Sequence, residues 1–162
     1  CAKRLGALGF NLLGWSRAAK NIDGVQCSHG AERLAAMLAQ ASITVLLLPL
    51  TEQTDGLMDR AAFDAMPAGS YLINCSRGEI VVEGDLIAAL DSGRLGAATL
   101  DAFVTEPLPG DSPLWQHPKV RVTPHIAALS APDTAALVLA EQVRRARNGQ
   151  RLAEQVDIDN GY

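Results

Sequence analysis

The stretch Ser70-Tyr-Leu-Ile-Asn-Cys-Ser-Arg77-Gly78 runs from a short apolar segment into a polar turn that carries an arginine. Glu106 and His125 each come just past a later apolar run. In an open α/β sheet, the loops at the carboxyl ends of the strands bind ligands, because the strands hold those loops rigidly. The pattern therefore predicts that Arg77, Glu106 and His125 meet at one edge of a parallel sheet.

These three side chains have complementary chemistry. An arginine can hold a carboxylate through two charge-assisted hydrogen bonds, and a histidine can deliver or take a proton near neutral pH. A nearby glutamate would keep the imidazole charged and aimed. Each residue alone has an ordinary explanation, since Arg77 and Glu106 could form a surface ion pair and His125 could be a loop histidine. Complementary chemistry at successive strand ends favours a catalytic site.

The composition indicates one globular domain or most of one. The chain has 162 residues, of which 48% are hydrophobic, and its formal net charge is -4; these values are ordinary for a soluble domain. The acidic balance gives no reason to expect a nucleic acid or a membrane as partner, and no apolar run approaches the roughly 18 residues of a membrane helix. Cys1, Cys27 and Cys75 lack disulfide or zinc spacing, so we expect no metal and a reducing cytoplasm.

Short apolar runs alternate with segments of helical spacing along the chain, which is typical of a doubly wound parallel α/β sheet. The run from Ile43 to Leu48 has the length and branching of a fully buried strand. His29 is expected in a polar loop, and residues 1–9 are expected to form the second half of a helix that ends at Gly9. Strands are predicted over 11–15, 43–48, 70–74, 95–100 and 120–123, and helices over 31–39, 59–66, 83–91 and 132–147.

The turn after the first predicted strand carries Ser16, Arg17 and Lys20. In a dinucleotide-binding sheet this turn faces the adenosine ribose, where an acidic residue selects NAD. A hydroxyl group and two cations suit a 2′-phosphate instead, although a solvated basic turn explains the same residues equally well. At the end of a later strand, Pro49 to Thr54 form either a ledge for the cofactor or a plain turn.

The chain carries, in order, the motifs Gly14-Trp-Ser-Arg17, Leu47-Leu-Pro49 with Thr51 and Thr54, Asn74-Cys-Ser-Arg77-Gly78, Leu100-Asp-Ala-Phe103 with Glu106-Pro107, Trp115-Gln-His-Pro118 and Thr123-Pro-His125. In this order and spacing they resemble the motifs of the D-isomer-specific 2-hydroxyacid dehydrogenase family. The similarity runs through the whole chain, and the Trp-Ser-Arg segment, the Trp-Gln-His-Pro turn and the terminal Gly-Tyr most resemble the branch that reduces glyoxylate and hydroxypyruvate.

The resemblance implies a cytoplasmic, homodimeric oxidoreductase that reduces a small 2-keto acid with NADPH, or alternatively with NADH. By position, Arg77 would bind the keto acid, and His125, paired with Glu106, would protonate its carbonyl oxygen. Ile126-Ala127-Ala128 stands where many relatives have a small residue and two glycines, and Ala127 would still contact the nicotinamide. The cofactor contacts implied are Ser16, Arg17, Lys20, Pro49, Thr54, Cys75, Ser76, Arg77, Asp101, His125 and Ala127.

The resemblance also implies how the chain is divided. Residues 1–124 would form a partial NAD(P)-binding Rossmann domain, and residues 125–162 would carry the catalytic histidine, a long helix and a tail that return to a separate substrate domain. The first strand and its glycine-rich turn are expected to precede Cys1, so we expect the 162 residues alone to bind cofactor poorly and to lack turnover. The alternative is a non-catalytic dinucleotide-binding regulatory module, which has no need of the proton donor.

Overall fold

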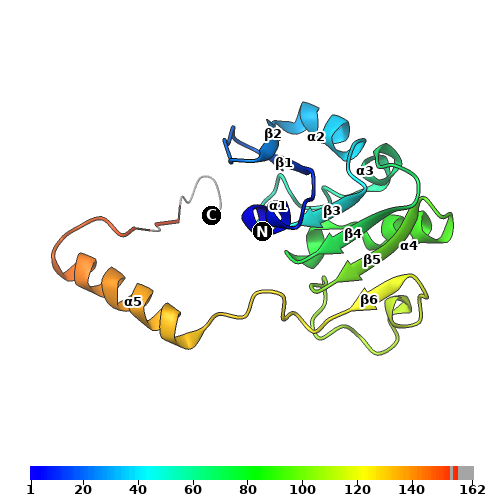
Figure 1. Cartoon of the computed structure of the whole chain (residues 1–162). Coiled ribbons are helices and arrows are strands. Elements are labelled where there is room, and N and C mark those ends of the chain that lie inside the picture. The colour runs from blue at the N-terminus through cyan, green and yellow to red at the C-terminus, as the bar shows by residue number, and fades with distance from the viewer. Residues whose placement is uncertain (154, 157–162) are drawn as a thin grey trace.

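The computed structural model describes residues 1–153, 155 and 156, and shows a parallel α/β fold (Figure 1). The predicted end of the tail, including the terminal Gly-Tyr, lies outside the described residues. The elements in chain order are α1 (Ala2–Ala7), β1 (Leu12–Ser16), β2 (Val25–His29), α2 (Ala31–Leu38), β3 (Ile43–Leu46), α3 (Arg60–Ala65), β4 (Ser70–Asn74), the 3-10 helix η1 (Gly78–Ile80), α4 (Glu83–Asp91), β5 (Leu95–Leu100), the 3-10 helix η2 (Pro113–Trp115), β6 (Val120–Val122) and α5 (Pro132–Arg147).

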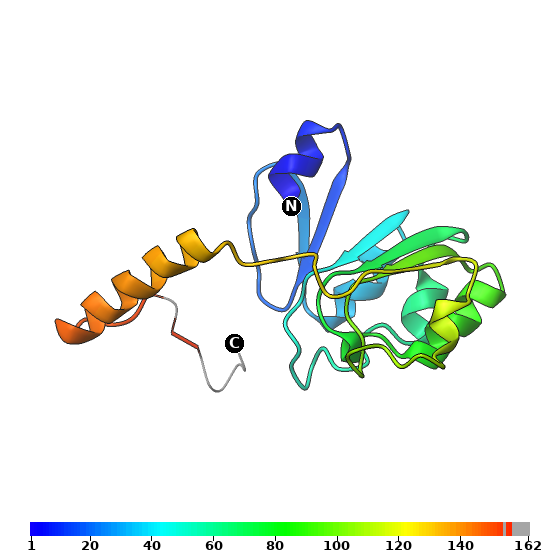
Figure 2. The same cartoon turned by 90° about the horizontal axis from the view of Figure 1, so that it is seen from below.

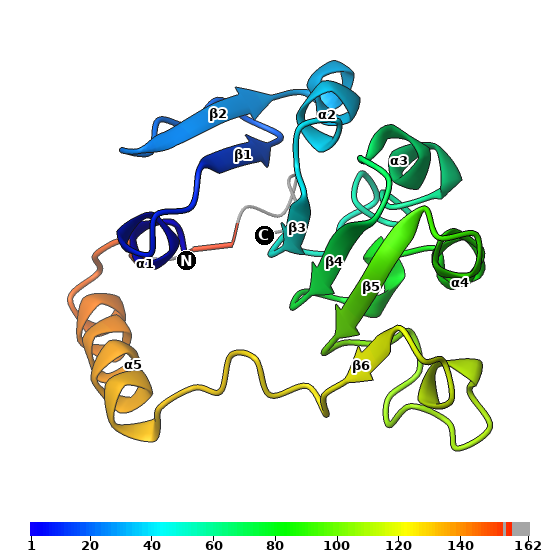
Figure 3. The same cartoon turned by 45° about the vertical axis from the view of Figure 1, so that its right-hand side comes forward.

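The strands form two parallel sheets instead of one. β1 pairs with β2, and the second sheet has the order β3-β4-β5-β6. Figure 3 shows the two sheets as separate units. The break falls between β1 and β3, which is where the usual strand order of a dinucleotide-binding sheet places its first strand. Among the described residues, β1 and β3 therefore each have only one strand neighbour.

The hydrophobic core lies between the four-stranded sheet and the helices α3 and α4, which lie on one side of it (Figure 3). Leu72 of β4, Phe63 of α3 and Leu90 of α4 are each at most 1% exposed. The opposite face of β3 is open, since Ile43 and Val45 are 48% and 38% exposed. The prediction of a strand buried on both faces is therefore wrong for β3, because no helix in the described part of the chain covers that second face.

Local sequence signals explain where several helices begin and end. The Asp59 carboxylate caps α3 by accepting the N–H of Ala62 at 2.9 Å, as expected for an N-cap aspartate. Gly93 follows α4 with a φ of 77°, a conformation that glycine adopts without strain. The predicted loop position of His29 is wrong, because His29 is the last residue of β2. Only Val25, Cys27 and Ser28 of this strand are even partly buried, so its apolar pattern is too weak to predict a strand.

The final helix, α5, stands apart from both sheets at the end of an extended segment (Figure 2). None of its residues is buried, and Leu137 and Leu139 are largely exposed. Glu141 forms ion pairs with Arg144 and Arg145 on its surface. None of the described helices is long and apolar enough to cross a membrane.

Candidate active site

A buried asparagine shapes the turn that carries Arg77. Asn74, the last residue of β4, is 1% exposed. Its Oδ1 accepts hydrogen bonds from the backbone N–H and the hydroxyl of Ser76, at 3.0 and 2.7 Å, while its Nδ2 donates to the Arg77 carbonyl at 2.8 Å. The guanidinium donates from Nη1 to the Ser76 carbonyl at 2.8 Å. These four hydrogen bonds fix the turn at the carboxyl end of the sheet.

Glu106 and His125 come together as the sequence predicts. Oε2 of Glu106 lies 2.8 Å from Nδ1 of His125, and Oε1 accepts the backbone N–H of Phe103 at 2.9 Å. The hydrogen bonds from His125 and Phe103 lower the pKa of Glu106, and the positive charge of Arg77 acts in the same direction. Because the two paired side chains are 37% and 45% exposed, their attraction contributes only about 0.2–1 kcal/mol to stability. Its main effect is to orient the imidazole ring.

Asp101 holds the segment that carries His125. This aspartate follows β5 and is 2% exposed. Its carboxylate accepts hydrogen bonds from the Thr123 hydroxyl and from the backbone N–H groups of Ile126 and Ala127, the latter two at 2.9 and 2.8 Å. Burial would raise the pKa of Asp101, but these hydrogen bonds outweigh it and lower the pKa. The hydrogen-bond partners of the carboxylate lie on both sides of His125 in the chain.

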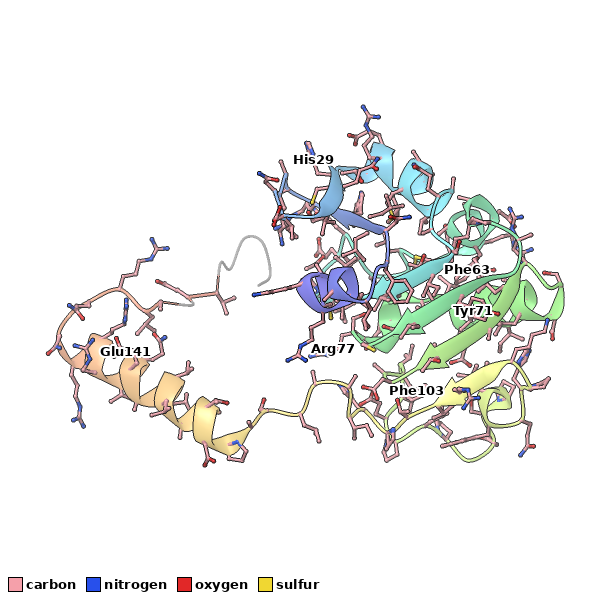
Figure 4. All side chains as sticks on the ribbon, in the orientation of Figure 1. His29, Phe63, Tyr71, Arg77, Phe103 and Glu141 are labelled. Atoms are coloured by element: carbon pink, nitrogen blue, oxygen red, sulfur yellow. The ribbon has the colours of Figure 1, made fainter. Side chains whose placement is uncertain are left out.

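The Arg77 turn also packs directly on the Glu106 loop, because Gly78 has no side chain. A Cβ atom at Gly78 would lie 2.0 Å from the carbonyl carbon of Phe103 and 2.2 Å from the nitrogen of Val104. Both atoms belong to the backbone, which cannot move aside as a side chain can. Arg77 and Phe103 accordingly lie at the same end of the four-stranded sheet (Figure 4).

A cleft of about 540 Å³ opens beside this turn, at the carboxyl ends of β3 and β4. Its volume is in the range of small-molecule sites. Cys75 is partly buried there, and burial followed by the charge of Asp101 raises the pKa of its thiol, which disfavours a nucleophilic role. The lining residues are Leu47, Leu48, Pro49, Leu50, Cys75, Ser76 and Arg77.

Thr54 lies behind one wall of the cleft. Its hydroxyl donates to the Pro49 carbonyl at 2.7 Å and accepts the backbone N–H of Thr51 at 2.8 Å. Thr54 is only 9% exposed, and both hydrogen-bonding functions of its hydroxyl serve the loop itself. The structure therefore shows Thr54 shaping the ledge that Pro49 contributes to the cleft.

The predicted basic turn belongs to the smaller sheet. Ser16 ends β1, and its hydroxyl donates to the Ala18 carbonyl at 2.8 Å. Trp15 fixes the neighbouring loop by donating from its indole nitrogen to the Gly30 carbonyl at 2.8 Å. Lys20 is exposed and Arg17 is partly buried. The cations thus lie on a different sheet from Arg77, Glu106 and His125.

Sequence reasoning missed several residues of this site. Asn74 and Gly78 were not assigned a role, although a polar residue that ends an apolar strand and a glycine directly after the arginine were visible signals. Leu50 of the cleft wall gave no signal beyond its apolar character. Within the described part of the chain, no cluster of three or more His, Cys, Asp or Glu side chains could hold a metal ion. The arrangement combines a carboxylate-binding cation with a carboxylate-oriented imidazole, which suits proton transfer to a bound anionic substrate.

Comparison with known proteins adds independent findings. Residues 1–127 match the model of the NAD-binding domain of D-isomer specific 2-hydroxyacid dehydrogenases. The chain is 47% identical over 161 residues to glyoxylate/hydroxypyruvate reductase A of Serratia proteamaculans, and this match covers 99% of the chain and 51% of that protein. The chain thus spans about half the length of this curated relative.

Two solved structures show the same architecture. A D-isomer specific 2-hydroxyacid dehydrogenase from Xanthobacter autotrophicus in complex with NADPH and MES superposes with a TM-score of 0.97 at 46% identity, over 99% of this chain and 66% of that one. An NADPH-dependent glyoxylate/hydroxypyruvate reductase from Sinorhizobium meliloti in complex with NADP and sulfate gives a TM-score of 0.94 at 39% identity, over 99% of this chain and 52% of that one.

Proposed function

Because the chain belongs to the D-isomer specific 2-hydroxyacid dehydrogenase family, we propose that it provides the cofactor-binding and catalytic part of an NADPH-dependent reductase of small 2-keto acids. Glyoxylate and hydroxypyruvate are the substrates proposed, after the reductases that the chain resembles. The observation that carries the proposal is the 2.8 Å contact between Glu106 and His125, at the sheet edge where Arg77 also lies.

Arg77, His125 and Glu106 each have a separate role in the reaction. Arg77 binds the carboxylate of the keto acid, because its planar fork matches that group. The hydrogen bond to Glu106 occupies Nδ1 of His125, so Nε2 is the atom that gives its proton to the carbonyl oxygen. Glu106 keeps the ring oriented and offsets the charge of the protonated imidazole. When bound, NADPH supplies the hydride that goes to the carbonyl carbon, which yields the 2-hydroxy acid.

The residues present fit a dinucleotide. The cleft combines apolar walls from Leu47, Leu48 and Pro49 with the polar Ser76 and Arg77, a mixture suited to a nicotinamide ring and its ribose. Ser16, Arg17 and Lys20 would hold the 2′-phosphate, as cations suit that group better than a ribose hydroxyl. The NADPH and NADP complexes of the two solved relatives support the same choice of cofactor.

The test is an assay of the full-length protein, expressed from its complete natural reading frame. NADPH oxidation at 340 nm is followed with glyoxylate and with hydroxypyruvate, and NADH is run in parallel. We expect turnover with NADPH, a lower kcat/KM with NADH, and loss of about 100-fold or more in kcat for His125→Ala, in line with removal of a general acid. Light scattering tests the proposed homodimer.

Two outcomes would contradict the proposal. A protein that binds NADPH tightly but oxidises it with neither keto acid would be the regulatory module instead of the enzyme. A His125→Ala variant with wild-type kcat would show that another group donates the proton. Arg77→Lys gives a third measure: we expect a higher KM for the keto acid, because a point charge cannot replace the bidentate fork.

A further inference from the structure

We propose that Asp101 is the positioning residue of the proton donor, acting through the backbone that flanks His125. This inference rests on the proposed function, because it assigns His125 as the donor. It concerns a carboxylate that contacts neither Glu106 nor the His125 ring through any hydrogen bond among the described residues.

The geometry surrounds His125 from both sides. Asp101 binds Thr123, two residues before the histidine, and Ile126 and Ala127, the two residues after it. The Asp101 backbone is itself fixed, since its N–H donates to the Asn74 carbonyl at 2.9 Å. Asp101 thus connects the segment that carries the imidazole to β4 and β5, the two central strands of the four-stranded sheet.

The backbone of His125 needs such support. Its φ is 53°, and no other non-glycine residue in the described ranges has a positive φ. A side chain in this left-handed region is disfavoured unless the surroundings impose the conformation, and such residues concentrate at functional sites. The hydrogen bonds that Asp101 accepts immediately after His125 impose it here.

Only a carboxylate can fill this role. Oδ1 accepts from both Thr123 and Ile126, and Oδ2 accepts from Ala127. An asparagine would place its amide N–H₂ group, which can only donate, against one of these donors. Oδ1 is shared by two donors and Oδ2 accepts from the third, so both oxygens of the carboxylate are needed to hold this backbone.

The test compares Asp101→Asn with the wild-type full-length protein, using two cofactors. One is NADPH, and the other is its reduced 3-acetylpyridine analogue, in which a methyl ketone replaces the carboxamide and no N–H remains. We expect kcat to fall about 100-fold, the order expected for a misplacement near 1 Å, and the loss should persist with the analogue, which offers no N–H to the carboxylate. The Kd of NADPH is measured in parallel by fluorescence.

Two further variants give a graded series. Thr123→Val removes one of the three donors and keeps the fold, and we expect it to lower kcat about fivefold, the equivalent of one ordinary hydrogen bond. Thr44→Val is the matched control, because the Thr44 hydroxyl is buried in β3 without a hydrogen-bond partner. It should leave kcat unchanged. If Asp101→Asn fails to fold, the kcat values of Thr123→Val and Thr44→Val still test the positioning role of Asp101.

A readout independent of turnover separates this inference from the proposed function. Amide hydrogen exchange at Ile126 and Ala127 should be at least about tenfold faster in Asp101→Asn, because each amide loses or weakens its acceptor. Wild-type protein without reductase activity would overturn the proposed function alone. Three results would overturn the positioning role of Asp101. They are unchanged amide exchange, unchanged kcat, and a fall in kcat that disappears with the acetylpyridine analogue while NADPH binding becomes weaker.

Discussion

Replacing Asn74 by alanine tests how the Arg77 turn is held. The substitution removes three hydrogen bonds, two to Ser76 and one to the Arg77 carbonyl, and Ser76 is only 5% exposed. At about 1 kcal/mol each, their loss should lower the free energy of unfolding by about 3 kcal/mol.

Urea unfolding of the full-length protein, with the m-value compared, measures this change. Ser70→Ala is the matched control, because Ser70 begins the same strand and its hydroxyl is buried without a hydrogen-bond partner. Removing it should alter stability by no more than about 0.5 kcal/mol. We also expect Asn74→Ala to raise the KM for the keto acid. A loss within 1 kcal/mol of the Ser70→Ala value would refute the role we assign to the asparagine.

Three other predictions follow from the structure. Gly78→Ala should destabilise the protein by about 4 kcal/mol, the size of a severe core strain, and should abolish activity. Gly84→Ala lies in α4, where the added Cβ meets nothing within 4 Å, so it should be neutral or stabilising by up to ~1 kcal/mol. Thermal unfolding of the two variants compares these effects. The folded-state pKa of Glu106 is lowered from 4.5, so its contribution to stability is present above that pH and is lost as the pH falls below it. Glu106→Gln should therefore flatten the dependence of the free energy of unfolding on pH, measured by urea unfolding from pH 6 to 3. An unchanged slope would contradict the pairing with His125. Ion pairs lower the pKa of Glu141 to about 2, and carbon-detected NMR should show that midpoint; a value near 4.5 would mean that the pairs do not persist in solution.

The strongly patterned elements were predictable from the sequence. The bounds of β4, β5, α4 and α5 were predicted correctly, because apolar runs, prolines and glycines mark their ends. β2 was missed because its burial alternates weakly. The exposure of Ile43 and Val45 was missed for a different reason, since a strand's own residues do not say whether both of its faces are covered.

The site was predictable in its chemistry but not in its support. Glu106 and His125 were expected to pair and do so, because strand ends of a parallel sheet converge. The partners of Asp101 could not be predicted from the sequence, since Ile126 and Ala127 lie 25 and 26 residues away. Asn74 acts within its own turn, and its position after an apolar strand was a signal that local reasoning could have used.

The basic turn follows β1, whereas Arg77, Glu106 and His125 follow β4, β5 and β6. The loop that would discriminate phosphate from hydroxyl on the adenosine ribose can be transplanted or redesigned without disturbing the strands that aim the acid. Coenzyme preference and turnover chemistry should therefore evolve as independent traits, and an engineer could exchange one while inheriting the other intact.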